Sequence, residues 1–479
     1  MAKVKIETIT PVHIGNGVKL QSNFEYLHFA NEKVVAPVDE QKVFNIIGKE
    51  NLDKWLNIID RKENLLNYLI RRKQSLTPED VAKRIIPIVA KSSIKSEFIY
   101  EHIHNGFALP YIPGSSLKGA IRTAILTQSI KSDKNNFVKS RNNLGKEKYK
   151  FNKQTQQKEP FFEFDDKKIQ KYFLGSDPNQ DIFRFLRTGD AYFNGTCLVV
   201  VKIANNLTDK GWEFSVKKQP DVVQQVECIP ENTSSLCSIS FADELTGEQR
   251  YDIEKSIPKL KNYMGKYFEI LKNISRSELF EIINKHTLWL LQKEQQFIQK
   301  QEQGADGIFD NYYIKLNALI EIAEKCNKNE CLLRLGFGSQ FNFITGGWQE
   351  DNMNPVDYAL LKRVPPRQRI PVDLPLPKTR RFTDYGAPLG FVKINLLTEE
   401  EYLKLKDILH TTTYKSEQPT SVSAPTAEPP QPPKPVYYTG KLKAGDLVDA
   451  ELVKIDPFNT KFKTFRLFPA FRIFPGHPL

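Results

Sequence analysis

The chain has 479 residues, of which 40% are hydrophobic, so it is too long for one ordinary domain and too apolar for a disordered protein. Lys and Arg number 69 against 57 Asp and Glu, and the resulting net charge of +12 favours a polyanionic partner, either nucleic acid or an anionic membrane. No apolar run approaches the roughly 20 residues that span a bilayer, and the N-terminus lacks the apolar core of a signal peptide. We therefore expect a cytoplasmic protein with a nucleic-acid partner and no membrane partner.

Three strand-like runs begin the chain. They lie at positions 4–9, 24–29 and 34–38, and in the first run apolar and polar residues alternate, as in a half-buried strand. Pro11 and the Gly15–Gly17 turn separate the first two runs. Helical spacing comes next, with a capping signal at Thr77, so we expect residues 39–100 to form a helical insertion.

The segment 111–127 combines a tight loop with a helix. Pro113 and Gly114 break the chain, two serines can cap the helix after them, and apolar residues from Leu117 onward fall at helical spacing. Small residues and cations gather at this helix start: Gly114, Ser115, Ser116, Lys118 and Arg122. Free N–H groups and the positive end of a helix dipole favour an anion there, so the segment predicts a phosphate site. A capped amphipathic helix whose cations only face water fits the same composition.

Residues 131–171 are basic, rich in Asn and Gln, and show little apolar periodicity. We interpret them as a long insertion, either a solvated surface loop or an arm that orders on RNA. Four aromatic residues could stack bases in the second case: Tyr149, Phe151, Phe161 and Phe162.

Buried strands and long helices are predicted beyond the insertion. The run Cys197–Ile203 is continuous and β-branched, as in a central strand buried on both faces, and residues 236–241 are a further strand candidate. From residue 249 to 330 we expect a helical insertion of two or three long amphipathic helices.

A glycine-rich stretch and a closing strand come next. Glycines allow a backbone to approach a partner closely, and nearby aromatic rings could stack on bases or form a core beneath the turn. The candidate binding residues here are Gly336, Phe337, Gly338, Ser339, Arg380 and Arg381. Residues 390–396 are the candidate closing strand, so the second part of the core covers 331–414.

The C-terminal region differs in composition. Residues 415–435 are rich in proline and small polar residues and predict an extended linker. Residues 436–479 alternate as strands and predict a small β-rich module. The module is OB-like in pattern but too short for a complete barrel, so we expect it to depend on a partner.

Catalytic and metal-binding groups are sparse. The five cysteines are odd in number and lack C-x-x-C spacing, so we expect reduced thiols and no zinc site or other cofactor. His102 and His104 would share a strand face, but no acid cluster is evident beside them. His13, next to the Gly15–Gly17 turn, could act as a general base for RNA cleavage, although a turn histidine more commonly bonds backbone.

Three motifs in this order resemble those of the RAMP superfamily of CRISPR effector proteins. They are Ile9–Gly17, with His13, Gly15 and Asn16, then Ile112–Arg122, then the glycine-rich Leu335–Gln340. The resemblance implies an α+β fold: a ferredoxin-like, RRM-type core in residues 1–248 and 331–414 that carries large helical insertions. It also implies that the candidate binding residues named above line an RNA path.

Within the superfamily, the chain resembles the fifth subunit of the type III-A effector complex, which caps the crRNA 3′ end. The likeness rests on the Thr10–Gly15 opening, a long helical middle and the ending formed by Thr379–Arg381 and Gly390–Ile394. This resemblance implies a non-catalytic crRNA-binding subunit that supports crRNA 3′ maturation. Its implied partners are crRNA, target RNA, a neighbouring backbone RAMP subunit, a small helical subunit and host nucleases.

The alternative is a RAMP endoribonuclease. Members that process precursor crRNA usually use a histidine, here His13, and members that cut target RNA use an acidic residue after the first strand. The loop 15–23 has no Asp or Glu, and only Glu25 and Asp39 flank it, which argues against target cleavage.

Overall fold

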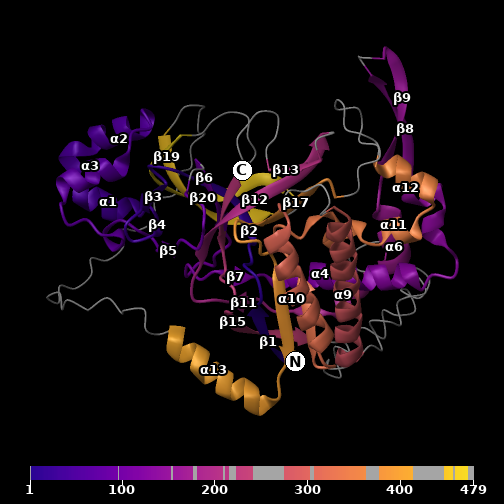
Figure 1. Cartoon of the computed structure of the whole chain (residues 1–479). Coiled ribbons are helices and arrows are strands. Elements are labelled where there is room, and N and C mark those ends of the chain that lie inside the picture. Colours follow the sequence, from indigo (N-terminus) through magenta and orange to yellow (C-terminus); the bar gives the residue numbers. More distant parts are fainter. Residues whose placement is uncertain are drawn as a thin grey trace. The chain divides into compact units, whose positions relative to one another are not determined.

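The computed structural model describes residues 2–94, 97–152, 155–175, 181–208, 211–214, 223–240, 275–301, 307–362, 377–413, 447–456 and 459–472. The chain divides into two compact units, Met1–Lys415 and Ser416–Leu479, which are described separately. The first unit mixes sheets and helices, so the predicted α+β class is confirmed (Figure 1).

A five-stranded antiparallel sheet forms the first layer of this unit. Its strand order is β10 (Arg187–Thr188), β15 (Ser234–Ser240), β1 (Ala2–Thr8), β18 (Phe391–Leu396) and β16 (Glu330–Arg334). Alternation in the sequence explains β1, whose Val4 and Ile6 are fully buried. The predicted first strand, the strand near residue 236 and the closing strand are therefore confirmed.

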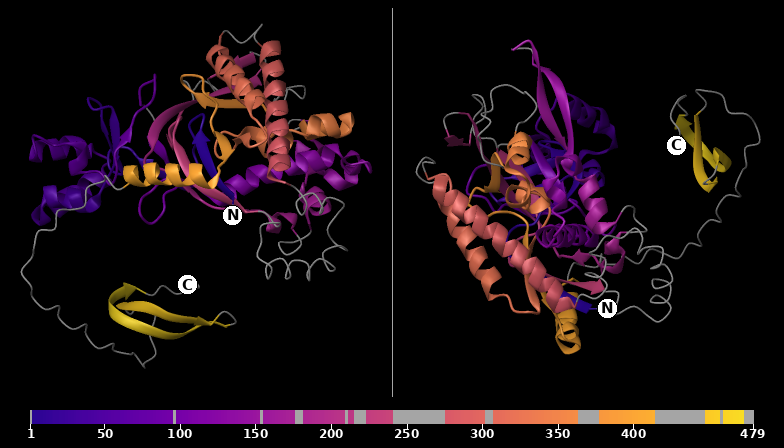
Figure 2. Two further views of the ribbon diagram at one scale, coloured as in Figure 1. Left: turned by 90° about the horizontal axis from the view of Figure 1, so that it is seen from below. Right: turned by 90° about the vertical axis from the view of Figure 1, so that its right-hand side faces the viewer.

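Helices α4 (Gly114–Lys131) and α9 (Arg276–Gln301) share one apolar core with this sheet. Leu117, Ile121 and Ala124 of α4 are buried at helical spacing in the same cluster as the β1 residues. Helix α10 (Asp310–Lys325) lies alongside α9, as both views in Figure 2 show. These are the long helices predicted in the region 249–330, of which residues 249–274 lie outside the described part.

A second sheet contains six strands. In order they are β13 (Gly211–Glu213), β12 (Cys197–Thr208), β14 (Val223–Cys228), β6 (Phe98–His102) and β2 (Gly15–Gln21), with β17 (Thr379–Thr383) also paired to β12. Strand β12 is buried from Cys197 to Val201, as its apolar run predicts.

Strand β2 corrects the prediction of a turn at Gly15–Gly17 and a loop to residue 23. The Gly-Asn-Gly run enters the sheet as its exposed last strand, antiparallel to β6. Gly17 has a φ of +89°, and the register against β6 shifts between Gly15 and Lys19. The turn-forming residues therefore produce an irregular strand.

The insertion after β2 has its own core. A three-stranded sheet packs with three helices: β3 (Tyr26–Phe29), β4 (Val34–Pro37), β5 (Ile86–Pro87), α1 (Glu40–Ile47), α2 (Leu52–Asp60) and α3 (Leu65–Arg72). The helix predicted from Thr77 is only a 3₁₀ turn, η2 (Pro78–Asp80), closed by a capping box.

The basic region 131–171 is not a plain surface loop. It folds into η3 (Phe137–Lys139), α5 (Arg141–Leu144), the hairpin β8 (Gly145–Asn152) with β9 (Gln157–Phe164), and α6 (Lys167–Leu174). Leu144, Ile169 and Phe173 are fully buried in one apolar cluster with β1 and α4, and they hold the base of the region. Ile169 and Phe173 are four residues apart, as on one face of a helix, but this signal covers only the short helix α6. Figure 1 shows the hairpin projecting from the body.

Short elements complete the first unit. They are η1 (Lys49–Asn51), β7 (Tyr111–Ile112), η4 (Ile182–Phe185), β11 (Ala191–Tyr192), the π-helical turn η7 (Asn342–Gly346), α11 (Gln349–Asn352), α12 (Pro355–Lys362) and α13 (Glu399–Thr413). The five cysteines are free. Among the described helices, none is long and apolar enough to cross a bilayer.

The second unit contains an antiparallel hairpin, β19 (Leu447–Asp456) with β20 (Asn459–Arg472). The predicted linker 415–435 and the strand candidate near residue 437 lie outside the described residues. The OB-like character of this module stays a prediction.

Candidate nucleic-acid interface

Helix α4 begins directly at Gly114, with Pro113 as its N-cap. The Gly114 N–H donates to Asp190 Oδ1 at 2.7 Å, and its carbonyl accepts from Thr188 Oγ1 at 2.6 Å. A Cβ at this position would overlap the Thr188 carbonyl, so glycine allows the close packing. The prediction that serines cap this helix is wrong, because Ser115 and Ser116 lie within its first turn and the Asp190 carboxylate accepts the first N–H instead.

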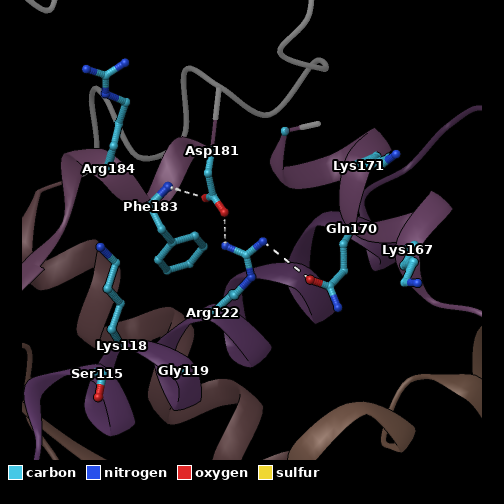
Figure 3. Close-up of a pocket in the computed structure, with 11 residues that line it drawn as sticks. Ser115, Lys118, Gly119, Arg122, Lys167, Gln170, Lys171, Asp181, Phe183 and Arg184 are labelled. Carbon is cyan, nitrogen blue, oxygen red and sulfur yellow. Dashed lines mark hydrogen bonds and ion pairs between the residues drawn. The ribbon is translucent and has the colours of Figure 1, made fainter. Parts of the chain in front are cut away.

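The exposed side of the first two turns of α4 lines a pocket of about 740 Å³, here called the α4 pocket (Figure 3). From α4 it is lined by Ser115, Lys118, Gly119 and Arg122. The rest of its lining comes from α6, η4 and the residues beside them: Lys167, Gln170, Lys171, Gly175, Asp181, Phe183 and Arg184. The two cations predicted in this motif therefore share a concave site.

Positive charge dominates the α4 pocket. Among the described residues, its lining contains five cationic side chains and one acid, Asp181. Arg122 Nη1 contacts Asp181 Oδ2 at 2.5 Å, and Arg122 Nη2 donates to Gln170 Oε1 at 3.5 Å. Burial lowers the pKa of Lys118, and the nearby cations Arg122 and Arg187 lower it further, against the opposing effect of Asp181. An anion in this pocket would relieve that repulsion.

His13, in the N-terminal motif Ile9–Gly17, is buried and only 3% exposed. Its Nδ1 is 2.6 Å from the backbone oxygen of Glu227, and because a carbonyl only accepts, Nδ1 carries the proton. Burial lowers the pKa of His13, with the Glu227 contacts opposing the shift. This arrangement matches a histidine that bonds backbone.

The glycine-rich loop closes onto the segment that contains His13. The Phe337 N–H donates to the His13 carbonyl at 2.9 Å, and the Leu335 N–H donates to the Gly390 carbonyl at 2.9 Å. Gly336 and Gly338 have φ values of +75° and +83°, which a side chain would strain. The structure thus brings together two motifs that are more than 300 positions apart in the sequence.

A strip of rings and cations lies beside this loop. Phe337 is partly exposed, and its ring stacks on that of Tyr100 with centroids 6.4 Å apart. The Arg381 guanidinium lies 5.8 Å from the Phe337 ring, and Lys19 Nζ lies 5.0 Å from the Tyr100 ring. Buried Arg381 Nε has no hydrogen-bond partner in the described residues. Tyr100 and Lys19 were not predicted from the sequence as binding residues. For Tyr100, the alternation of residues along strand β6 was a signal that its ring lies on one face of a sheet.

Asn16 and Ser339 have local bonding roles. Asn16, on the exposed strand β2, donates from Nδ2 to Glu101 Oε2 at 2.6 Å. Ser339 is buried, and its hydroxyl donates to the Gly336 carbonyl at 2.7 Å.

Arg380 lies in the core, although it was predicted to line the same path as Arg381. It is 1% exposed, its Nε donates to Glu294 Oε1 at 2.7 Å, and its Nη2 donates to Glu294 Oε2 at 3.2 Å. Its guanidinium also lies 4.2 Å from the Phe297 ring. Because adjacent residues on a strand point to opposite faces, only Arg381 is placed for a ligand.

The residues of the nuclease alternative do not gather in one site. Asp39 is the N-cap of α1 and accepts from the N–H groups of Gln41 and Lys42. Glu25 is exposed and accepts from the Gln21 N–H at 2.6 Å. Both carboxylates lie beside the small sheet of the insertion, whereas His13 contacts Glu227 and Phe337.

Glu101, His104 and Glu227 do gather, contrary to the prediction that no acid cluster lies beside the His102/His104 pair. Their ligand atoms lie within 4.8 Å of one another, a donor set that could hold a divalent cation. However, Arg84 Nη2 lies 2.8 Å from a carboxylate oxygen of each glutamate and supplies the positive charge.

Glu227 is held in this cluster by an extensive set of donors. It is fully buried and also accepts from Arg84 Nε, the Thr196 hydroxyl and the His102 N–H. Burial opposes the ionisation of Glu227, but the contacts with Arg84 lower its pKa overall. We interpret the cluster as a structural tie between the insertion and the six-stranded sheet.

The comparisons with known proteins agree with this architecture. The family model of the RAMP superfamily matches residues 5–343, and the chain belongs to this superfamily. Among its relatives, the chain is similar to the Streptococcus thermophilus CRISPR protein Csm5, with 26% identity over 262 residues, which cover 52% of this chain and 64% of the relative.

Csm5 of Methanocaldococcus jannaschii is 27% identical over 293 residues, covering 57% of this chain and 63% of the relative. The chain thus spans less than two thirds of either relative.

Two solved structures have a similar fold. One is a chain in a cryo-EM structure of a Csm–crRNA–target RNA ternary complex of a type III-A CRISPR-Cas system, with a TM-score of 0.56 and 20% identity. The other is the crystal structure of T. onnurineus Csm5, with a TM-score of 0.52 and 18% identity. Each similarity covers 82% of this chain and all of the other.

Proposed function

We propose that this protein is a non-catalytic crRNA-binding subunit at the 3′-end side of a type III-A CRISPR effector complex. The observation that carries the proposal is the α4 pocket, where Lys118 and Arg122 of the superfamily motif share a cavity with three more cations. A cationic cavity beside a helix start suits phosphate groups, which make up the recognised surface when RNA of any sequence must be held. The relatives named Csm5 support the placement in a type III-A complex.

The proposed RNA path continues from the α4 pocket to the glycine-rich loop. Thr123 Oγ1 donates to the Ile344 carbonyl at 3.0 Å, which joins α4 to the segment after this loop. On this path we place Ser115, Ser116, Lys118, Arg122, Gly15, Asn16, Gly336, Phe337 and Arg381. Gly338 and Ser339 are buried and support the glycine-rich loop from within. Gly114 and His13 are buried and hold the protein backbone of the two motifs in place through hydrogen bonds. Arg380 is left out because its guanidinium is paired with Glu294 in the core.

The β8–β9 hairpin is the second part of the proposed RNA surface. Tyr149 is 63% exposed and Phe151 is 51% exposed, so both rings are available to stack on bases. Phe162, one of the four aromatic residues that the sequence suggested for base stacking, is 5% exposed and belongs to the core, so we do not include it.

We further propose that the five-stranded sheet is the ferredoxin-like core of the superfamily. Its central order β15-β1-β18-β16 is fully antiparallel, and α4 and α9 pack against one face, which supports this assignment. In this assignment β15 is the first of the four core strands and pairs with β1, although β15 comes from the middle of the chain.

The absence of catalysis is part of the proposal. His13 is 3% exposed, Asp39 accepts backbone hydrogen bonds as the N-cap of α1, and the carboxylates of the Glu101–Glu227 cluster are bonded by Arg84. The 3′ maturation of crRNA is then carried out by recruited host nucleases. Neighbouring partners are a backbone RAMP subunit, a small helical subunit and the target RNA paired with the crRNA.

A binding titration tests the proposal. The affinity of the purified full-length protein for a crRNA-length single strand should fall steeply with salt, with a slope in log–log form of about −0.7 per neutralised phosphate. A flat salt response would refute this electrostatic account. Mass spectrometry of co-purifying proteins tests the assembly, and recovery of the chain without other effector subunits would count against it.

A further inference from the structure

We infer that the α4 pocket binds consecutive phosphates of one RNA strand. Lys118 and Arg122 of α4 form one wall of this site, and Lys167 and Lys171 of the basic insertion form the second wall. Asp181 orients Arg122 within it. This inference rests on the proposed function and assigns a role to α6, the last helix of the basic region, which was not singled out from the sequence. The ligand class is a single-stranded ribose-phosphate backbone, recognised without regard to base sequence.

The arrangement of cations carries the inference. In Figure 3, Arg122 lies at the centre, with Lys118 on one side and the lysines of α6 on the other. Lys167 and Lys171 are four residues apart on α6, so they lie on the same face of the helix, and both are exposed. Cations thus extend across the pocket from α4 to α6, as consecutive phosphates of a strand would require.

The size and the lining of the pocket favour a backbone segment. Its volume of about 740 Å³ lies in the range of about 300–1,000 Å³ typical of pockets for small molecules and cofactors, so it exceeds the need of a lone phosphate. The aromatic ring in the lining, Phe183, is 2% exposed, and the Arg122 guanidinium lies 5.2 Å from it. Among the described residues of the lining, a base therefore has no free ring face to stack on, and the phosphates are the recognised groups.

Asp181 has two bonds that define its role. Its Oδ1 accepts from the Phe183 N–H at 2.8 Å, which caps η4, and its Oδ2 holds Arg122. The carboxylate aims the guanidinium toward Gln170 and also competes with a phosphate for it. Replacement by asparagine keeps an oxygen for the cap and removes the competing charge.

Charge variants of α6 test the second wall in the full-length protein. Lys167→Gln and Lys171→Gln should each make the salt slope of RNA binding shallower by about 0.7 and weaken two unrelated RNA sequences by the same factor. Lys168→Gln is the matched control, because Lys168 is exposed on the same helix and its Nζ donates to the Asn142 carbonyl at 2.7 Å. Asp181→Asn should tighten RNA binding.

The outcomes separate this inference from the proposed function. If the wild-type protein does not bind RNA, the proposed function fails. If it binds and Lys118→Ala weakens binding, but Lys167→Gln and Lys171→Gln match Lys168→Gln, only the inference fails. If a variant folds poorly, crosslinking of RNA to the wild-type protein tests whether α6 contacts the RNA. Crosslinks to peptides that contain residues 167–171 support the second wall, and crosslinks confined to the loop 336–339 overturn it.

Discussion

The Phe337 N–H donates a hydrogen bond to the His13 carbonyl at 2.9 Å, and this bond joins the N-terminal motif to the glycine-rich loop. A Cβ at the adjacent Gly336 would lie 2.5 Å from the same carbonyl oxygen. Two motifs of the superfamily therefore depend on each other's backbone, and the side chain absent at Gly336 is what permits the contact.

Gly336→Ala should destabilise the protein by about 1–3 kcal/mol, because the left-handed φ of +75° and the clash with His13 both oppose a side chain. Chemical denaturation measures this loss. Gly195→Ala is the control, since Gly195 has open space around its Cβ position and no positive φ. Equal stability of the two variants would show that the loop does not need its glycine.

Adjacent arginines should behave in opposite ways. Arg380→Ala leaves Glu294 buried without its partner and should cost about 3–5 kcal/mol of unfolding free energy. Arg381→Ala should leave the melting temperature nearly unchanged and weaken RNA binding several-fold, since Arg381 borders the partly exposed Phe337 ring. Melting curves and RNA titrations of both variants check this division, which would be contradicted by a stable Arg380→Ala protein that has lost RNA affinity.

Stability should depend on pH through His102. Burial, followed by the nearby His13 and His104, lowers the pKa of His102 from 6.5 to about 3. Because the folded-state pKa is depressed, the unfolded chain binds a proton that the folded protein does not. The stability contribution is therefore present above pH 6.5 and is lost as the pH falls toward 3.

This residue alone should remove about 1.4 kcal/mol per pH unit below pH 6. Denaturation of the wild type and His102→Gln at pH 7, 6 and 5 gives the measurement. A wild-type protein that is equally stable at all three values would disprove the assignment.

The protein should leave precursor and target RNA intact, with or without Mg²⁺. His13→Ala should lower stability and cause no difference in cleavage, because His13 is 3% exposed and its ring is packed against Phe337. Gel analysis of labelled RNA after long incubation is the check. Cleavage by the wild type that disappears in His13→Ala would establish the processing nuclease, and metal-dependent cleavage lost at Glu25 or Asp39 would establish the target nuclease.

Local patterns predicted much of this fold. The spacing of Leu117, Ile121 and Ala124 indicates the buried face of α4, and the apolar run from Cys197 indicates a central strand. Both signals arise from burial of neighbouring positions in one element, which a sequence displays directly.

Long-range contacts were not accessible in the same way. Arg84 and Glu227 meet across 143 positions, and their pairing turns an apparently isolated histidine pair into a closed ionic cluster. Composition gave the wrong prediction at Gly15–Gln21, which is a strand despite its glycines. Asp181, which pairs with Arg122, lies outside any motif in the sequence.

The most direct test of the central claim is the affinity of a Lys118→Ala/Arg122→Ala double variant for a crRNA-length strand that remains uncut during the titration. Lys134→Ala/Lys139→Ala, which removes two exposed cations outside the α4 pocket, is the matched control. We predict that the first variant loses at least about ten-fold in affinity, equally for unrelated sequences, and that the control stays close to the wild type. Equal affinity of the two variants, with both correctly folded, would contradict the account.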